Sequence, residues 1–193
     1  MLNKLRYGID QDRMPNIAFK MMAAVFKIRD RFFSLDKLLD QFEIMDGQTI
    51  IDYGCGTGTY VGRASRLAGE KGKVFAVDIH ELAIKEIDKK IHRENLNNVI
   101  GILAKGNHSP LEDDTADMIY ALDVFHMVSN PKAFLKELNR ISKPDGVLYI
   151  DNGHQPREKA REKILSSGAW SIVEENNRYL RCRPVTHGHD GAS

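Results

Sequence analysis

Cysteine is scarce in this sequence. Its 193 residues include only Cys55 and Cys182, which lie far apart and have no second thiol at CxxC spacing, and no HExxH motif is present. This scarcity excludes a disulfide-stapled fold and a thiolate metal cluster. We therefore expect a reducing compartment, which means a cytoplasmic protein, and no bound metal.

Long apolar runs are absent as well. No stretch of about 18 apolar residues occurs, and the opening stretch MLNKLRYGIDQDRMP lacks the apolar segment of a secretory signal. We expect neither export nor stable membrane insertion.

The chain also lacks an excess of charge of either sign. It carries 28 Lys plus Arg against 27 Asp plus Glu, a formal net charge of +1. Nucleic-acid and anionic-membrane binding usually come with a basic excess, so we expect no nucleic-acid partner and a small or neutral substrate. A length of 193 residues suits one domain that buries a core without staples.

What the sequence does contain is a regular alternation of short apolar runs with helix-period segments. Such alternation is typical of a parallel sheet with covering helices. Gly69, Asn95 and Lys143-Pro144 stand where helices should stop. The predicted strands are Thr49–Tyr53, Lys73–Ile79, Asn98–Leu103, Met118–Leu122 and Val147–Asp151, and the predicted helices are Thr59–Ala68, Glu81–Glu94, Pro131–Ile141 and Arg157–Ser167.

The two ends of the chain depart from this alternation. Trp170–Glu174 and Arg178–Arg183 flank a polar turn and predict a closing antiparallel hairpin. Residues 186–193 are expected to form a disordered tail. Before the first strand, Asn16–Phe33 has apolar residues at helical spacing, and Leu35–Phe42 predicts a second, short helix.

Two roles are open for the apolar side chains of this N-terminal region. They line a lid over an apolar acceptor, or they pack against the sheet. Because helix-period apolar residues usually make core, we expect packing for most of them. The set comprises Phe19, Met21, Met22, Phe26, Phe32 and Phe33.

A glycine-rich turn follows the first predicted strand, in residues 50–59 with the sequence IIDYGCGTGT. Glycines there permit positive φ and close approach of a ligand to the backbone. The dinucleotide fingerprint G-x-G-x-x-G does not fit, because its third glycine would fall on Thr59 or Val61. The pattern is instead D-x-G-x-G-x-G, from Asp52 to Gly58.

This pattern resembles the first motif of the class I S-adenosylmethionine-dependent methyltransferases. Their cofactor has an ammonium and a sulfonium group in place of a pyrophosphate, and a carboxylate near the turn favours positive charge. The alternative is a turn-capping Asp52 beside a plain strand-to-helix turn. The resemblance implies S-adenosylmethionine as cofactor, bound by Asp52, Gly54, Cys55, Gly56 and Gly58.

The second predicted strand ends in an acid. Asp78, followed by Ile79, lies about twenty residues past the last motif glycine, the interval of a ribose-binding carboxylate. The alternative role for Asp78 is to cap the helix that starts at Glu81. His80 is expected at the surface.

Three later segments continue the resemblance. The loop 104–117 resembles the family's adenine loop, with Asn107 in place of an acid and His108 beside it, although a turn cap at Asn107 is an equal alternative. The run 117–128 resembles the fourth-strand motif and predicts Asp123 and His126 at the carboxyl edge of the sheet. Residues 141–151 resemble the turn into strand five, with Asp145 for a glycine.

Together these motifs imply a Rossmann-like, doubly wound α/β fold. The expected sheet has seven mostly parallel strands and a C-terminal antiparallel hairpin. Residues 46–185 would form the methyltransferase domain, and residues 1–45 an N-terminal helical cap in the same domain.

The implied reaction is an in-line methyl displacement to a small-molecule acceptor, for which orientation and exclusion of water supply much of the catalysis. His126 is the first candidate for a general base, ahead of His108 and His154, and the alternative is that His126 only packs beneath the site. Quinone-like, lipid-amine and small polar acceptors all remain open. An NAD(P)-binding oxidoreductase and a non-catalytic S-adenosylmethionine-binding protein are the rival functions.

Overall fold

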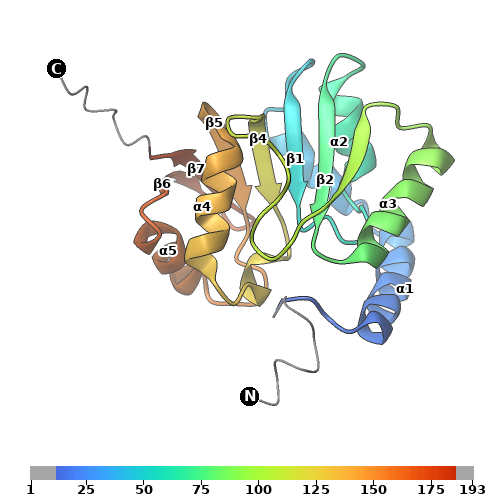
Figure 1. Cartoon of the computed structure of the whole chain (residues 1–193), viewed down its shortest axis with the longest axis horizontal. Helices are drawn as coiled ribbons and strands as arrows, with labels where there is room; N and C mark the ends of the chain where they lie inside the picture. The colour runs from blue at the N-terminus through green and yellow to red at the C-terminus, as the bar shows by residue number, and fades with distance from the viewer. Residues whose placement is uncertain (1–11, 186–193) are drawn as a thin grey trace.

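Parallel strands form the centre of the molecule. The computed structural model describes residues 12–185, and within this range the strands make a seven-stranded sheet in the order β3-β2-β1-β4-β5-β7-β6 (Figure 1). Strands β1 to β5 are parallel, and β7 runs antiparallel to both β5 and β6. The predicted fold class is confirmed. The strands are β1 Thr49–Tyr53, β2 Lys73–Asp78, β3 Val99–Leu103, β4 Ala116–Ala121, β5 Ser142–Ile150, β6 Trp170–Glu175 and β7 Leu180–Pro184.

Helices cover both faces of the sheet (Figure 1). The 3-10 helix η1 (Leu35–Gln41), α2 (Val61–Ala68) and α3 (Glu81–Glu94) lie on one face, and α4 (Pro131–Ile141) and α5 (Arg157–Ser166) lie on the other. Successive strand residues point to opposite faces, and each face is buried, which explains why the strands read as continuous apolar runs. No helix in the described range is long and apolar enough to cross a membrane.

The order of the strands creates a natural crevice. The chain proceeds from β1 outward to β3 and then returns to place β4 on the other side of β1, with Ile50 paired to Met118. Because the connections after β1 and β4 leave toward opposite faces, the carboxyl ends of these two strands lie at the topological switch point, where open α/β sheets bind ligands. This edge holds the candidate site.

Strand β5 begins earlier than predicted. The sequence predicts a start at Val147, where its apolar run begins, yet the structure pairs Ala116 with Ser142 and then Met118 with Val147. The intervening residues form an irregular, bulged stretch, and a bulge is where a sheet tolerates proline. The ion pair of Lys143 Nζ with Asp117 Oδ1, at 2.6 Å, holds this stretch beside β4.

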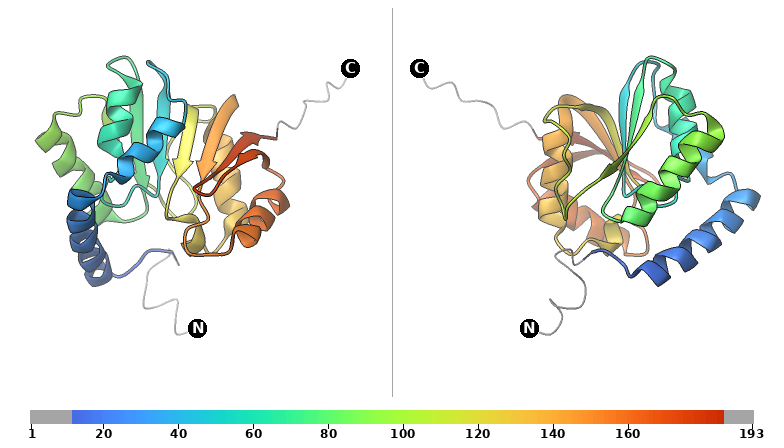
Figure 2. Two further views of the ribbon diagram at one scale, coloured as in Figure 1. Left: turned by 180° about the vertical axis from the view of Figure 1, so that it is seen from behind. Right: turned by 45° about the vertical axis from the view of Figure 1, so that its right-hand side comes forward.

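Helix α1 (Asn16–Phe32) contradicts the expectation that its apolar stripe packs against the sheet. Figure 2 shows α1 standing away from the sheet, beside α3. Met21 is 68% exposed and Phe32 is 74% exposed, and Phe33 just beyond the helix is 63% exposed. The helix instead buries its opposite side, where Phe19 and Ala23 pack against α3. The predicted tail, residues 186–193, lies outside the described residues, as do residues 1–11.

Candidate functional site

A cleft of about 260 Å³ lies at the carboxyl ends of β1, β2 and β4. Most of the predicted site residues meet there, although they come from four separate loops. Asp52, Gly58 and His108 are the predicted residues that do not line it. Those that line it are Gly54, Cys55, Gly56, Asp78, Ile79, Asn107, Asp123 and His126.

The glycines of the turn after β1 have different structural roles. Gly54 has a φ of +85°, and a Cβ there would lie 2.7 Å from Cγ2 of Val124, so this glycine permits close packing of the turn on the loop after β4. Gly56 has a φ of +51° and no atom within 4 Å of where its Cβ would be. A side chain at Gly56 would therefore extend into open space on the wall of the cleft, which is the space a bound ligand would use.

Asp78 ties the end of β2 to this turn. Its Oδ2 accepts the N–H of Gly56 at 2.9 Å, and its Oδ1 accepts the N–H of His80 at 2.8 Å. Burial raises the pKa of the Asp78 carboxyl, and the hydrogen bonds from backbone N–H groups offset part of that rise. The carboxylate is thus fixed in the cleft wall, and it keeps acceptor capacity for a ligand hydroxyl.

Asp52 lies deeper than the sequence suggests. Its side chain is only 2% exposed and does not line the cleft. Burial raises the pKa of this carboxyl to about 8, with a partial offset from the Tyr120 hydroxyl and a further rise from Asp78. A direct contact between Asp52 and the ammonium group of a cofactor would require the turn to open.

His80 is buried, which contradicts its predicted surface position. It is 2% exposed because the Phe19 ring of α1 stacks on its imidazole with 4.3 Å between ring centroids. Its Nδ1 accepts the N–H of Leu82 at 3.1 Å and so caps α3. The capping role proposed as an alternative for Asp78 therefore belongs to His80.

The loop after β3 contributes Asn107 to the cleft but not His108. Asn107 lines the cleft, but the next residue, His108, turns away from it, with its side chain 71% exposed and its Nδ1 3.2 Å from Oε2 of Glu137. The predicted place of His108 in the cofactor site is not supported by this geometry. Its partner belongs to a polar network that the sequence patterns did not reveal.

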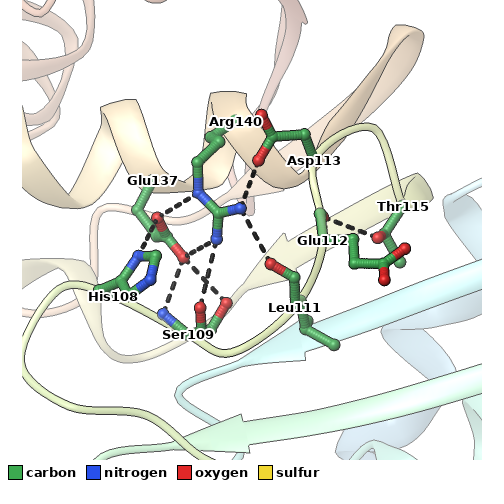
Figure 3. Close-up of polar contacts among 8 residues, drawn as sticks. All are labelled: His108, Ser109, Leu111, Glu112, Asp113, Thr115, Glu137 and Arg140. Carbon is green, nitrogen blue, oxygen red and sulfur yellow. Dashed lines mark hydrogen bonds and ion pairs between the residues drawn. The ribbon is translucent and has the colours of Figure 1, made fainter.

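This network anchors the loop to α4 (Figure 3). Oε1 of Glu137 accepts the N–H and the hydroxyl of Ser109 at 2.8 and 2.9 Å, and Nη2 of Arg140 donates to it at 2.7 Å. Nη1 of Arg140 reaches Asp113 at 2.6 Å. Burial acts to raise the pKa of Glu137, but the hydrogen bonds from Arg140 and Ser109 outweigh it and hold the pKa at about 2. Glu137 is therefore a structural carboxylate.

A polar group stands at the carboxyl ends of β4 and β5. Asp123 has a φ of +58°, and both oxygens of Asp151 accept its N–H at 3.0 Å. Nε2 of His154 lies 3.6 Å from Oδ1 of Asp123, and the rings of His126 and His154 meet edge to face at 4.8 Å. Burial lowers the pKa of His126. The role of Asp151 was not anticipated, because only the pairing of β4 with β5 brings it near Asp123.

The inner side of α1 closes the cleft with apolar side chains. Phe19, Met22 and Phe26 line it from this helix, opposite Phe134 of α4. The helix is held to the glycine-rich turn, where the Thr59 hydroxyl donates to Oδ2 of Asp30 at 2.7 Å and accepts from Arg29. No local pattern in the sequence predicts these contacts, because the residues that they join are separated by 30 and 29 positions in the chain.

Known methyltransferases resemble this chain in sequence and in fold. Residues 44–188 match a family model described as a methyltransferase domain. A solved S-adenosylmethionine-dependent methyltransferase from Aquifex aeolicus is 28% identical, with a TM-score of 0.73 over 90% of this chain and 100% of that one. A putative methyltransferase of the same kind from Methanococcus maripaludis has a TM-score of 0.73 at 16% identity, over 93% and 98% of the two chains, and shows the shared fold.

Curated relatives carry the same family signal over part of their length. The ubiquinone/menaquinone biosynthesis C-methyltransferase of a Shewanella species is 29% identical over 128 residues, which are 66% of this chain. The match spans about half of that relative, 51% of its length. With a family model covering most of the chain and a solved relative covering nine-tenths of it, the chain belongs to the methyltransferase domain family, in the S-adenosylmethionine-dependent class I group that its glycine-rich turn predicted.

Proposed function

We propose that this protein transfers the methyl group of S-adenosylmethionine to a small, largely apolar acceptor bound in the cleft. The observation that carries the proposal is the wall built from Gly56 and Asp78. There a positive-φ glycine leaves open space beside a fixed carboxylate, at the switch point of the sheet.

The cofactor would lie along this wall. Ribose hydroxyls would donate to Asp78, whose oxygens accept the N–H groups of Gly56 and His80 and whose carboxylate has acceptor capacity left. The amide oxygen of Asn107 would accept from the adenine amino group. The remaining predicted contacts that line the cleft are Gly54, Cys55, Ile79 and Asp123, whereas Asp52 and Gly58 lie outside its lining.

The acceptor would enter between α1 and α4. The side chains of Phe19, Met22, Phe26 and Phe134 favour an apolar body, such as an aromatic ring. A relative named as a C-methyltransferase of ubiquinone/menaquinone biosynthesis supports a quinone-like ring among the open acceptor classes.

Methyl transfer needs little covalent work from the protein. When bound, the cofactor would supply a methyl group that its sulfonium already activates, because the electron pair of the carbon–sulfur bond would go to sulfur as the nucleophile approached in line. Holding the two molecules in line can supply roughly 7–11 kcal/mol of the barrier reduction in favourable systems. His126 lines the cleft and is the proposed proton acceptor for a hydroxyl or amine nucleophile.

The location and chain organisation form part of the same proposal. The two cysteines are free and buried, which suits a reducing, cytoplasmic compartment. Of the predicted cap, residues 1–45, the described part, residues 12–45, would act as a cap within the same domain as residues 46–185. The balanced charge favours a small acceptor over a nucleic acid.

Two measurements test the proposal. Thermal shifts with S-adenosylmethionine, S-adenosylhomocysteine and NADH should show stabilisation by the first two, about 2.7 kcal/mol at a concentration one hundred times the dissociation constant. A cell extract supplied with methyl-labelled cofactor should then yield a labelled small molecule, identified by mass. A shift with NADH alone would overturn the cofactor assignment, and binding without a labelled product from any extract would favour a non-catalytic binding protein.

A further inference from the structure

Three side chains with metal-binding groups converge in the cleft at the carboxyl ends of β4 and β5. Asp123 follows β4, His126 lies in the short 3-10 helix η2 (Phe125–Met127), and His154 lies in the loop after β5. Because β4 and β5 are adjacent and parallel, the loops at their carboxyl ends meet. One ligand atom from each residue lies within 4.8 Å of the others, and all three residues line the cleft.

The backbone around these residues is arranged to keep them together. Asp123 adopts a φ of +58°, a conformation that costs energy for a residue with a Cβ and persists only where surrounding contacts impose it. The half-buried carboxylate of Asp151 imposes it by accepting the N–H of Asp123, and the same carboxylate accepts the N–H of Gly153 at 3.1 Å. One side chain thus orders both of the loops that supply the ligands.

A glycine permits close packing at the site. A Cβ at Gly153 would lie 2.2 Å from Nδ1 of His126, so only glycine lets this loop close over the imidazole. That Nδ1 is buried and has no hydrogen-bond partner among the described residues. A buried ring nitrogen without a partner is unfavourable, and it indicates a contact that the protein chain alone does not supply.

We propose that Asp123, His126 and His154 bind one divalent transition-metal ion, with zinc as the probe. Two imidazole nitrogens and a carboxylate are a donor set that such ions prefer, and three protein ligands leave a coordination position open. The open position faces the cleft, where the acceptor would lie. The ligand atoms must approach one another until each is about 2.0–2.2 Å from the ion, and rotation of His154, whose side chain is 81% exposed, provides this closure.

The role of the ion rests on the proposed function, whereas its binding does not. A coordinated acceptor hydroxyl loses its proton to solvent more readily, because the cation stabilises the oxyanion. The acceptor then forms its new bond to the methyl carbon, while the carbon–sulfur pair returns to sulfur. The ring nitrogen of His126 that binds the metal cannot also accept a proton. In the metal-bound protein the ion therefore takes over the role of activating the nucleophile that was proposed above for His126.

Zinc titration of the EDTA-treated full chain tests the site. Two histidines near the C-terminus, His187 and His189, offer a competing zinc site, so every protein carries His187→Ala and His189→Ala. In this background we expect one equivalent of zinc by calorimetry. His154→Ala and Asp123→Asn should each weaken zinc binding by more than about tenfold. His92→Ala, which removes an exposed histidine from α3, should leave it unchanged.

Two further readouts keep the result interpretable. Melting temperatures of the variants establish that each is folded, and the zinc X-ray absorption edge should report two imidazole ligands. Equal zinc affinity in the background protein and in His154→Ala would overturn the inference. Titration with S-adenosylmethionine in the same samples distinguishes a failure of the metal site from a failure of the proposed function. Cofactor binding without zinc binding refutes the metal site alone. Zinc binding without cofactor binding refutes the proposed function alone.

Discussion

Replacing Gly56 by alanine is the sharpest test of where the cofactor lies. The added methyl group would meet no protein atom within 4 Å, so it creates no packing clash in the free protein. The φ of +51° still penalises a Cβ, and we expect a loss of stability of about 1–2 kcal/mol from that source. Any effect beyond this strain must come from the space that the methyl group occupies.

Gly168→Ala provides the matched control. Gly168 has a φ of +69° and also has no atom within 4 Å of its would-be Cβ, but it lies after α5 and does not line the cleft. Both variants should therefore lose similar stability in urea unfolding. In Gly56→Ala the methyl group would press on a bound ligand, and overpacking typically costs about 1–3 kcal/mol.

Calorimetric titration with S-adenosylmethionine measures that cost. Since 1.4 kcal/mol is a factor of ten, the affinity of Gly56→Ala should fall roughly 5- to 150-fold, and that of Gly168→Ala should not change. If Gly56→Ala binds the cofactor as tightly as the control does, the ligand does not approach this turn. The reasoning from the open glycine would then be refuted.

Three other predictions concern the surrounding structure. Because the folded-state pKa of Asp52 is raised to about 8, the native state binds the carboxyl proton of Asp52 more tightly than the unfolded state does. The free energy of unfolding should therefore fall as the pH rises from about 4 toward 8. Asp52→Asn should flatten this dependence when urea unfolding is measured between these two pH values. The pKa of Glu137 is held at about 2, so its contribution is present above about pH 4.5 and is lost as pH falls toward 2. Glu137→Ala should cost about 2–4 kcal/mol at pH 7 by leaving Ser109 and Arg140 without their partner, and an unchanged urea midpoint would contradict the network. Ile28→Gln and Phe32→Gln on the exposed side of α1 should each change stability by less than about 0.5 kcal/mol, and a loss of several kcal/mol by thermal melting would mean that this side is buried.

Local signals were sufficient to predict most of the secondary structure. The bounds of β1, α3 and α4 agree with the sequence prediction because their ends are marked by residues with a defined local role. The side chain of Asn130 accepts the N–H of Ala133 at the start of α4, and Asn95 ends α3 with a φ of +53°. The glycine-rich turn is of the same kind, since its spacing rejected a dinucleotide and its pattern resembles the first motif of the family.

Contacts between distant residues decided the rest. His80 is buried only because Phe19, from a helix far earlier in the chain, covers it, and the apolar stripe of α1 is exposed because that helix turns its other side to α3. The grouping of Asp123, His126 and His154 forms no sequence motif, which is why the sequence predicted no metal. The sequence by itself determined the elements and the cofactor turn, because these depend on residues a few positions apart. Only the order of the strands, which sets β4 beside β5, decided which side chains meet in the cleft at the carboxyl ends of these two strands.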